Sequence, residues 1–127
     1  MHFLIDTHIF ISLINEDSNL DERTIKAIEI PSNQKLISIV SLWEIVIKIN
    51  IGKLNVTRNL QEMYDLIEKS EISVLGIQKK DLDIYMRLPL IHKDPFDRLI
   101  ISQALANDLT VITDDQYIRN YPNLKLF

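Results

Sequence analysis

Short apolar runs alternate along this chain with longer segments of helical periodicity, the pattern of repeated strand–helix–strand units. The runs predict strands over 3–5, 36–39, 72–77 and 109–113, and the tail 123–127 has the composition of a short fifth strand. Apolar residues three and four positions apart predict helices over 8–14, 21–30, 59–69 and 79–88, a helix that Ser41 opens and Gly52 ends, and a helix that begins at 94–97. The alternation predicts the α/β class, with helices on both faces of a parallel sheet of four to five strands.

Composition agrees with one globular domain over residues 1–127. Hydrophobic residues make up 46% and charged residues 25% of the chain, the proportions of an ordinary soluble domain. The chain has no cysteine, which excludes disulfides and thiolate metal sites and fits a reducing compartment. The first residues carry no basic leader, and no stretch of 18 apolar residues occurs, so we expect a cytoplasmic protein.

Four acidic residues each follow a predicted strand or lie in the first turn of the helix after one: Asp6, Glu44, Asp97 and Asp115. The carboxyl ends of parallel strands meet along one edge of a sheet, so these side chains are expected to converge there. Two carboxylates about 4 Å apart repel by roughly 4 kcal/mol at an effective dielectric near 20. A cluster of four therefore predicts a divalent metal ion among them.

Each acid also has a purely structural explanation. Ser41 and Glu44 match a capping box, and Asp94 and Asp97 resemble one, with a proline between them at the first helical position. Asp6 can be explained as the cap of the helix after the first strand, and the fourth acid as part of a turn. Capping alone does not account for the placement of all four acids at the same predicted edge, and a capping carboxylate keeps lone pairs free for a metal.

The remaining candidate residues point away from other chemistries. His8 and His92 lie near predicted acids, but histidines in a small domain more often have packing or surface roles, and Trp43 is expected in the core. Thr7 and Ser41 have no histidine partner at a spacing typical of a catalytic triad, which argues against nucleophilic hydrolysis. With only two glycines, the chain cannot form a Gly-rich phosphate loop.

The net charge of −4 is unfavourable for nucleic-acid binding, but it includes the proposed metal ligands. Of the 18 acidic residues, setting aside those four leaves 14 against 14 basic residues. The remaining surface is therefore neutral overall and compatible with a local basic rim. Five basic residues near the motif segments are candidates for this rim, although scattered surface charges explain each of them equally well: Lys48, Lys53, Arg58, Lys93 and Arg98.

Four stretches of the chain, LIDTHIFI, SLWEIVIKINIGKL, HKDPFDRLIISQALAND and LTVITDDQYIRNYP, resemble the successive signature blocks of PIN-domain proteins, specifically the VapC-type toxins of type II toxin–antitoxin pairs. The resemblance spans the whole chain. It implies the PIN-like three-layer α/β/α fold. It also matches the four acids of the family motif to Asp6, Glu44, Asp97 and Asp115, while Asp114 occupies a position that the motif leaves open.

This resemblance implies a Mg²⁺- or Mn²⁺-dependent endoribonuclease that hydrolyses single-stranded or looped RNA, forms a homodimer and is inhibited by a cognate antitoxin protein. Asp6, Glu44 and Asp97 would hold the ion, and Asp115 would complete its shell directly or through water. A housekeeping RNA-processing nuclease and a non-catalytic PIN-like interaction module remain alternatives. Phosphoaspartyl enzymes and receiver domains are disfavoured, because Asp6-Thr7-His8 is not a D-x-D motif and no acidic pair precedes the first strand.

Overall fold

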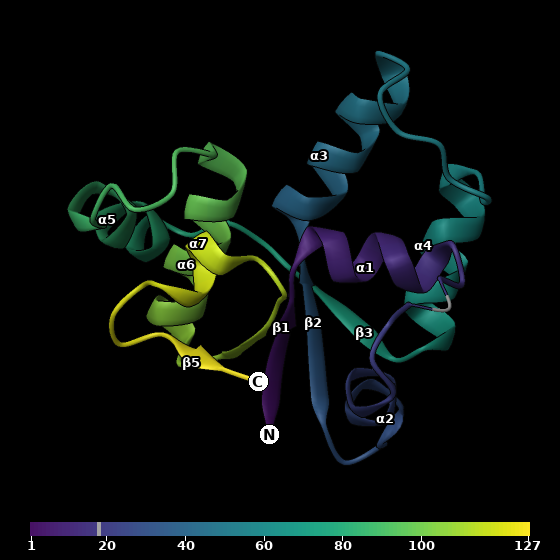
Figure 1. Ribbon diagram of the computed structural model, residues 1–127, viewed down its shortest axis with the longest axis horizontal. Helices are drawn as coiled ribbons and strands as arrows, with labels where there is room; N and C mark the ends of the chain where they lie inside the picture. Colours follow the sequence, from purple (N-terminus) through teal and green to yellow (C-terminus); the bar gives the residue numbers. More distant parts are fainter. Residues whose placement is uncertain (18) are drawn as a thin grey trace.

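The computed structural model describes residues 1–17 and 19–127 (Figure 1). Its strands are β1 (His2–Ile5), β2 (Gln34–Ser38), β3 (Ile72–Leu75), β4 (Thr110–Ile112) and β5 (Lys125–Leu126). Its helices are α1 (Thr7–Ile14), α2 (Glu22–Glu29), α3 (Ile39–Asn50), α4 (Leu60–Lys69), α5 (Lys79–Arg87), α6 (Pro95–Asn107) and α7 (Gln116–Arg119). None of these helices is long and apolar enough to cross a membrane.

The strands form one parallel sheet in the order β3-β2-β1-β4-β5, which confirms the predicted α/β class and the fifth strand. β1 is central and pairs with β2 on one side and β4 on the other, with Ile5 opposite both Ile37 and Ile112. The ends of these strands therefore lie at the same level. Residues that directly follow β1 and β4 are neighbours at the carboxyl edge of the sheet.

Helices cover both faces of the sheet and bury two separate apolar cores, which gives the expected three layers (Figure 1). Successive residues of a strand point to opposite faces. Phe3 and Ile5 accordingly pack into the core beneath α1, α2 and α4, whereas Leu4 packs into the core beneath α6 and α7. The first core also contains Ile45 of α3.

Several predicted boundaries differ from the structure. β2 ends at Ser38, and α3 begins at Ile39, because the Ser38 hydroxyl oxygen accepts the N–H of Val40 and caps the helix. Ser41 is thus the third residue of α3 and not its cap. β3 and β4 are shorter than predicted, and the short helix α7 was not predicted at all; it forms where Asp115 caps the chain after β4.

Candidate metal centre

Asp6 lies at the carboxyl end of the central strand β1 and is the N-cap residue of α1. Its Oδ1 accepts the N–H of Ile9 at 2.8 Å, and its Oδ2 accepts the hydroxyl of Thr113, the residue after β4. The side chain is buried, with 1% of the residue exposed. Asp6 is therefore a helix cap whose second oxygen faces the neighbouring strand end.

Asp115 reaches the same edge through the segment after β4. It is the N-cap residue of α7, and its Oδ1 accepts the N–H groups of Tyr117 at 2.8 Å and Ile118 at 3.1 Å. Its own N–H donates to the Thr113 hydroxyl oxygen at 3.0 Å. The single hydroxyl of Thr113 therefore joins Asp6 to Asp115, as both a donor and an acceptor.

His92, in the loop before α6, connects Asp115 to Asp97. Its Nε2 lies 2.9 Å from Oδ2 of Asp97 and 3.5 Å from Oδ2 of Asp115. The N–H of Asp94 donates to its Nδ1 at 3.2 Å, so a neutral ring carries its proton on Nε2, the nitrogen that faces the two carboxylates. One ligand atom from each of His92, Asp97 and Asp115 lies within 4.8 Å of the other two.

Asp94 is the N-cap residue of α6, as predicted, and Pro95 is the first helical residue. Its Oδ1 accepts the N–H groups of Phe96 at 2.8 Å and Asp97 at 3.3 Å. The Asp97 carboxylate lies against His92 and does not accept the N–H of Asp94, which donates to the His92 ring instead. The second hydrogen bond of a capping box, from the N–H of Asp94 to the Asp97 carboxylate, is therefore not formed. Capping does not explain the position of the Asp97 side chain.

Glu44 lies in the second turn of α3, so the predicted capping box with Ser41 is wrong. The Ser41 hydroxyl oxygen instead accepts a hydrogen bond from the Thr7 hydroxyl at 2.8 Å, which joins α3 to α1. Glu44 is 2% exposed, and its Oε2 lies 2.9 Å from Nζ of Lys48. Its Oε1 is buried and has no hydrogen-bond partner within the described part of the chain.

The electrostatic environment shows that these carboxylates share one region. Burial raises the pKa of Asp97 to about 7, and the charges of Asp94 and Glu44 are the next largest causes. Burial also raises the pKa of Asp6, although hydrogen bonds from Ile9 and Thr113 oppose the shift. The charge of Asp6 also raises the pKa of Asp97, as the charge of Glu44 does. The acids at the end of β1, in α3 and in α6 therefore repel one another.

This donor set fits a hard divalent cation. Carboxylate oxygens are the ligands that Mg²⁺ and Mn²⁺ prefer, and the buried Oε1 of Glu44, which has no hydrogen-bond partner among the described residues, is an oxygen that such an ion would satisfy. Burial, together with the charge of neighbouring acids, raises the pKa of Asp6 and Asp97, so their ionised forms are disfavoured in a way that a bound cation would offset. His92 Nε2 lies 2.9 Å from the Asp97 carboxylate and 3.5 Å from that of Asp115, so the ring adds a nitrogen to the oxygens of this cluster.

The part played by His92 could not be inferred from residue type, which favours packing or surface roles. The ring is half-buried, lies between two of the four proposed ligands and accepts a hydrogen bond from the capping residue of α6. A signal was present in the sequence, since His92 stands two residues before Asp94 and five before Asp97. His8, by contrast, is exposed.

Asp114, the acid that the sequence left without a role, is exposed beside the same edge. It lines a hollow of about 250 Å³ together with Asp6, His8, Ser12 and Asp115. Through this hollow, the part of the site that contains the buried Asp6 is open to solvent. It therefore provides a route by which a ligand could approach the carboxylates from the α1 side.

The five basic candidates do not form a continuous rim around the acids. Arg98 is buried, and its guanidinium donates to carbonyls of the segment before α6 and to the hydroxyl of Tyr121, so its proposal as a surface cation is wrong. Arg58 lies 3.3 Å from a carboxylate oxygen of Glu16. Lys48 is paired with Glu44, and Lys53 and Lys93 are exposed.

An all-parallel sheet that gathers carboxylates from β1, α3, α6 and the end of β4 at one edge defines a class of α/β proteins with an acidic site at the strand ends. The sequence matches the PIN-domain family model over residues 3–124. The chain belongs to the PIN-domain family. A search of curated proteins gave no significant match.

Several solved structures share the fold along their whole length. VapBC2 from Rickettsia felis, bound to a promoter DNA fragment, superposes with a TM-score of 0.76 and 22% identity, over 100% of this chain and 98% of that chain. VapBC-1 from nontypeable Haemophilus influenzae superposes with a TM-score of 0.68 and 20% identity, over 100% of this chain and 97% of that chain. FitAcB from Neisseria gonorrhoeae superposes with a TM-score of 0.63 and 19% identity, over 98% of this chain and 96% of that chain. At these identities the likeness concerns the fold.

Proposed function

We propose that this protein is a metal-dependent endoribonuclease, a VapC-like toxin that hydrolyses single-stranded or looped RNA. The observation that carries the proposal is the set of buried carboxylates at the strand ends of a PIN fold, where burial raises the pKa of Asp6 and Asp97 and neighbouring acids raise it further. The likeness to solved VapBC structures supports the toxin assignment and a cognate antitoxin as partner. The exposed position of Asp114 beside Asp6 gives an open side for an extended strand to enter.

Asp6, Glu44 and Asp97 would hold the ion, and Asp115 would complete its shell directly or through water. When bound, Mg²⁺ or Mn²⁺ supplies an activated water and stabilises charge that develops on the phosphate. The chain's own contribution is orientation: the N–H of Ile9 and the hydroxyl of Thr113 fix both oxygens of Asp6. His92 orients Asp97 and Asp115, because its Nε2 lies between their Oδ2 atoms.

Purified protein is expected to cleave RNA with exposed loops in Mg²⁺ or Mn²⁺, to lose this activity in chelator, and to leave duplex DNA essentially intact. Only a splayed strand can bring its phosphate into the hollow beside Asp6. The measurement is gel analysis of a defined stem–loop RNA and a DNA duplex of the same sequence. RNA cleavage that neither chelator nor added metal changes would contradict the proposal.

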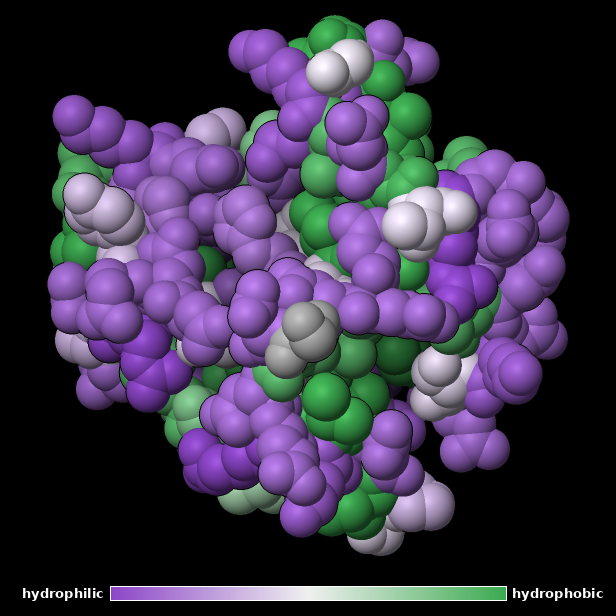
Figure 2. All heavy atoms as spheres, turned by 45° about the vertical axis from the view of Figure 1, so that its right-hand side comes forward, coloured by the Kyte–Doolittle hydropathy of each residue, from purple (hydrophilic) through white to green (hydrophobic). Residues whose placement is uncertain are grey.

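We expect a homodimer that forms through an exposed apolar surface on α3 and α5. Figure 2 shows hydrophobic side chains exposed along α3, and the most exposed apolar residues beside it come from α5 and the following loop. Trp43 is 58% exposed against an edge of Phe96, so its predicted place in the core is wrong. Leu82 and Met86 of α5 are 54% and 88% exposed. A second copy would cover this surface.

Light scattering at micromolar concentration should give about twice the chain mass of 14.8 kDa. Trp43→Glu should shift the protein toward the monomer, because a charge would enter the centre of the covered surface. The matched control is Tyr64→Glu on α4, where the residue is 43% exposed and the dimer should persist. A monomeric wild-type mass throughout the accessible concentration range would remove the dimer.

A further inference from the structure

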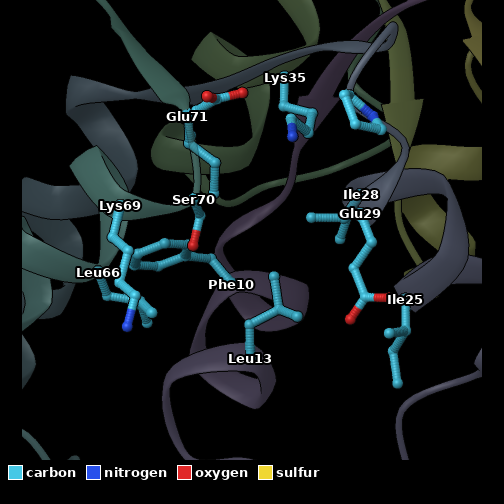
Figure 3. A pocket seen from close by; sticks show the side chains of 12 residues that line it. Phe10, Leu13, Ile25, Ile28, Glu29, Lys35, Leu66, Lys69, Ser70 and Glu71 are labelled. Atoms are coloured by element: carbon cyan, nitrogen blue, oxygen red, sulfur yellow. The ribbon is translucent and has the colours of Figure 1, made fainter.

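The charges around the acidic site do not favour a polyanion such as RNA. The net charge of the chain is −4, and the basic candidates form no continuous rim among the described residues. A cavity of about 340 Å³ between α1, α2 and α4 is not an extension of the site, because it reaches the amino ends of β2 and β3, at the edge of the sheet opposite the acids (Figure 3). We therefore looked beside the acids for an uncharged group that binds RNA.

Tyr117 is an exposed aromatic residue at the border of the acidic site. It lies in α7, two residues after Asp115, and 60% of it is exposed. Its backbone N–H donates to Oδ1 of Asp115 at 2.8 Å, which fixes its position relative to a proposed metal ligand. Its ring lies against the ring of His92, with 5.3 Å between the centroids, and Nε2 of that histidine is 2.9 Å from Oδ2 of Asp97.

The ring of Tyr117 has surface available for a ligand. The rings of Tyr117 and His92 meet at 44°, so the histidine does not cover the tyrosine as a parallel stacked ring would. Tyr121 shows what a structural tyrosine looks like in this segment, since it is 4% exposed and its hydroxyl accepts the N–H of His92 and donates to the carbonyl of Pro89. The loop that contains His92 is thus held by Tyr121, and the exposed ring of Tyr117 is not required for this purpose.

We propose that Tyr117 stacks on one unpaired base of the RNA, in a nucleotide next to the phosphate that binds at the acids. This inference rests on the proposed nuclease function and states how the substrate is held. Unpaired bases of RNA loops stack on aromatic side chains, whereas the bases of a duplex stack on one another. Stacking requires no charge on the protein and accepts every base, so it binds RNA beside repelling carboxylates without fixing the sequence.

The test measures binding of a labelled stem–loop RNA by fluorescence anisotropy in Mg²⁺. Every protein carries Asp6→Asn, so that the RNA stays intact and one repelling charge is removed; this single variant is the parent. Tyr117→Ala should weaken binding about 5- to 150-fold, the ratio expected for one base stacked on an aromatic ring. Tyr117→Trp keeps an aromatic face and should bind at least as tightly as the parent. The control is Tyr64→Ala, an exposed tyrosine of α4, which should bind like the parent.

A single abasic nucleotide, placed at each loop position in turn, identifies the base that stacks. At one position it should weaken binding to the parent by about the same factor as Tyr117→Ala. The two changes combined should weaken binding no further, because both remove the same contact. A general disturbance of the fold by Tyr117→Ala would instead add to the effect of every abasic position.

Additive effects at all loop positions would overturn the proposal, as would a Tyr117→Ala protein that binds RNA like the parent, or the absence of saturable RNA binding. Weaker binding of the cognate antitoxin with unchanged RNA binding would also overturn it and would assign the ring to the protein partner. Failure of the nuclease assignment is recognised separately on a gel, as wild-type protein that binds the unmodified RNA and does not cut it.

Discussion

Asp6→Asn protein should lose RNA cleavage almost completely while it keeps its fold. Asparagine caps helices as well as aspartate, so the bond from the N–H of Ile9 should survive. The substitution removes the negative charge and the oxygen that accepts the Thr113 hydroxyl. The loss should exceed the roughly 10–100-fold that follows removal of an outer-shell partner in metal sites, because a proposed ligand is removed.

The matched control is Asp94→Asn, the same change at a half-buried helix cap, where cleavage should remain within a few-fold of wild type. Glu44→Gln and Asp97→Asn should each behave like Asp6→Asn, and Asp115→Asn should do so or nearly so. Cleavage of a labelled stem–loop RNA and circular dichroism would be measured on each variant. If Asp6→Asn protein, shown free of contaminating ribonuclease, cuts as fast as wild type, the metal-site argument and the nuclease assignment both fail.

Without metal, the free energy of unfolding should decrease as pH rises from about 4 to about 7, and Asp97→Asn should remove part of this decrease. Burial raises the pKa of Asp97 to about 7 from 3.8, so in this window the folded state binds more protons than the unfolded state. The stabilising contribution of the protonated form is complete below about pH 4 and is lost above about pH 7. At 1.36 kcal/mol per pKa unit, this one group accounts for at most about 4 kcal/mol.

Urea unfolding in chelator at pH 4.5, 6 and 8 would measure this effect. At pH 8, Asp97→Asn should be as stable as the wild type or more stable, because one of several crowded charges is gone. The variant should also bind Mn²⁺ more weakly. A clear loss of stability at pH 8, of the roughly 0.5–2 kcal/mol typical of a lost cap, would instead assign Asp97 a structural role only.

The parallel sheet and the shared position of the acids could be predicted because both follow from local patterns. Strand and helix periodicity set the element order, and the carboxyl edge of a parallel sheet then brings together residues such as Asp6 and Asp115. The cap of α3 was misplaced because Ser38 and Ser41 are both good capping residues three positions apart. Only the end of β2 decides between them.

The properties that depend on tertiary contacts could not be predicted from the sequence. Arg98 was a candidate for a basic rim because it lies near a motif segment, but the carbonyls of the segment before α6 and the hydroxyl of Tyr121 bind it in the interior. Trp43 was assigned to the core because α3 is strongly apolar, yet that helix has more apolar faces than the sheet covers. The contacts of His92 require the loop and α6 to fold together.

The buried Arg98 has a consequence for when the acidic site acquires its order. Its guanidinium donates to the carbonyls of Leu88, Pro89 and His92, and Arg98 follows Asp97 directly in α6. Arg98, which follows the proposed ligand Asp97, therefore holds the loop that contains His92. The His92 ring in turn faces Asp97. The entropy of arranging this half of the site is lost during folding, so an incoming ion or RNA strand meets side chains already in place.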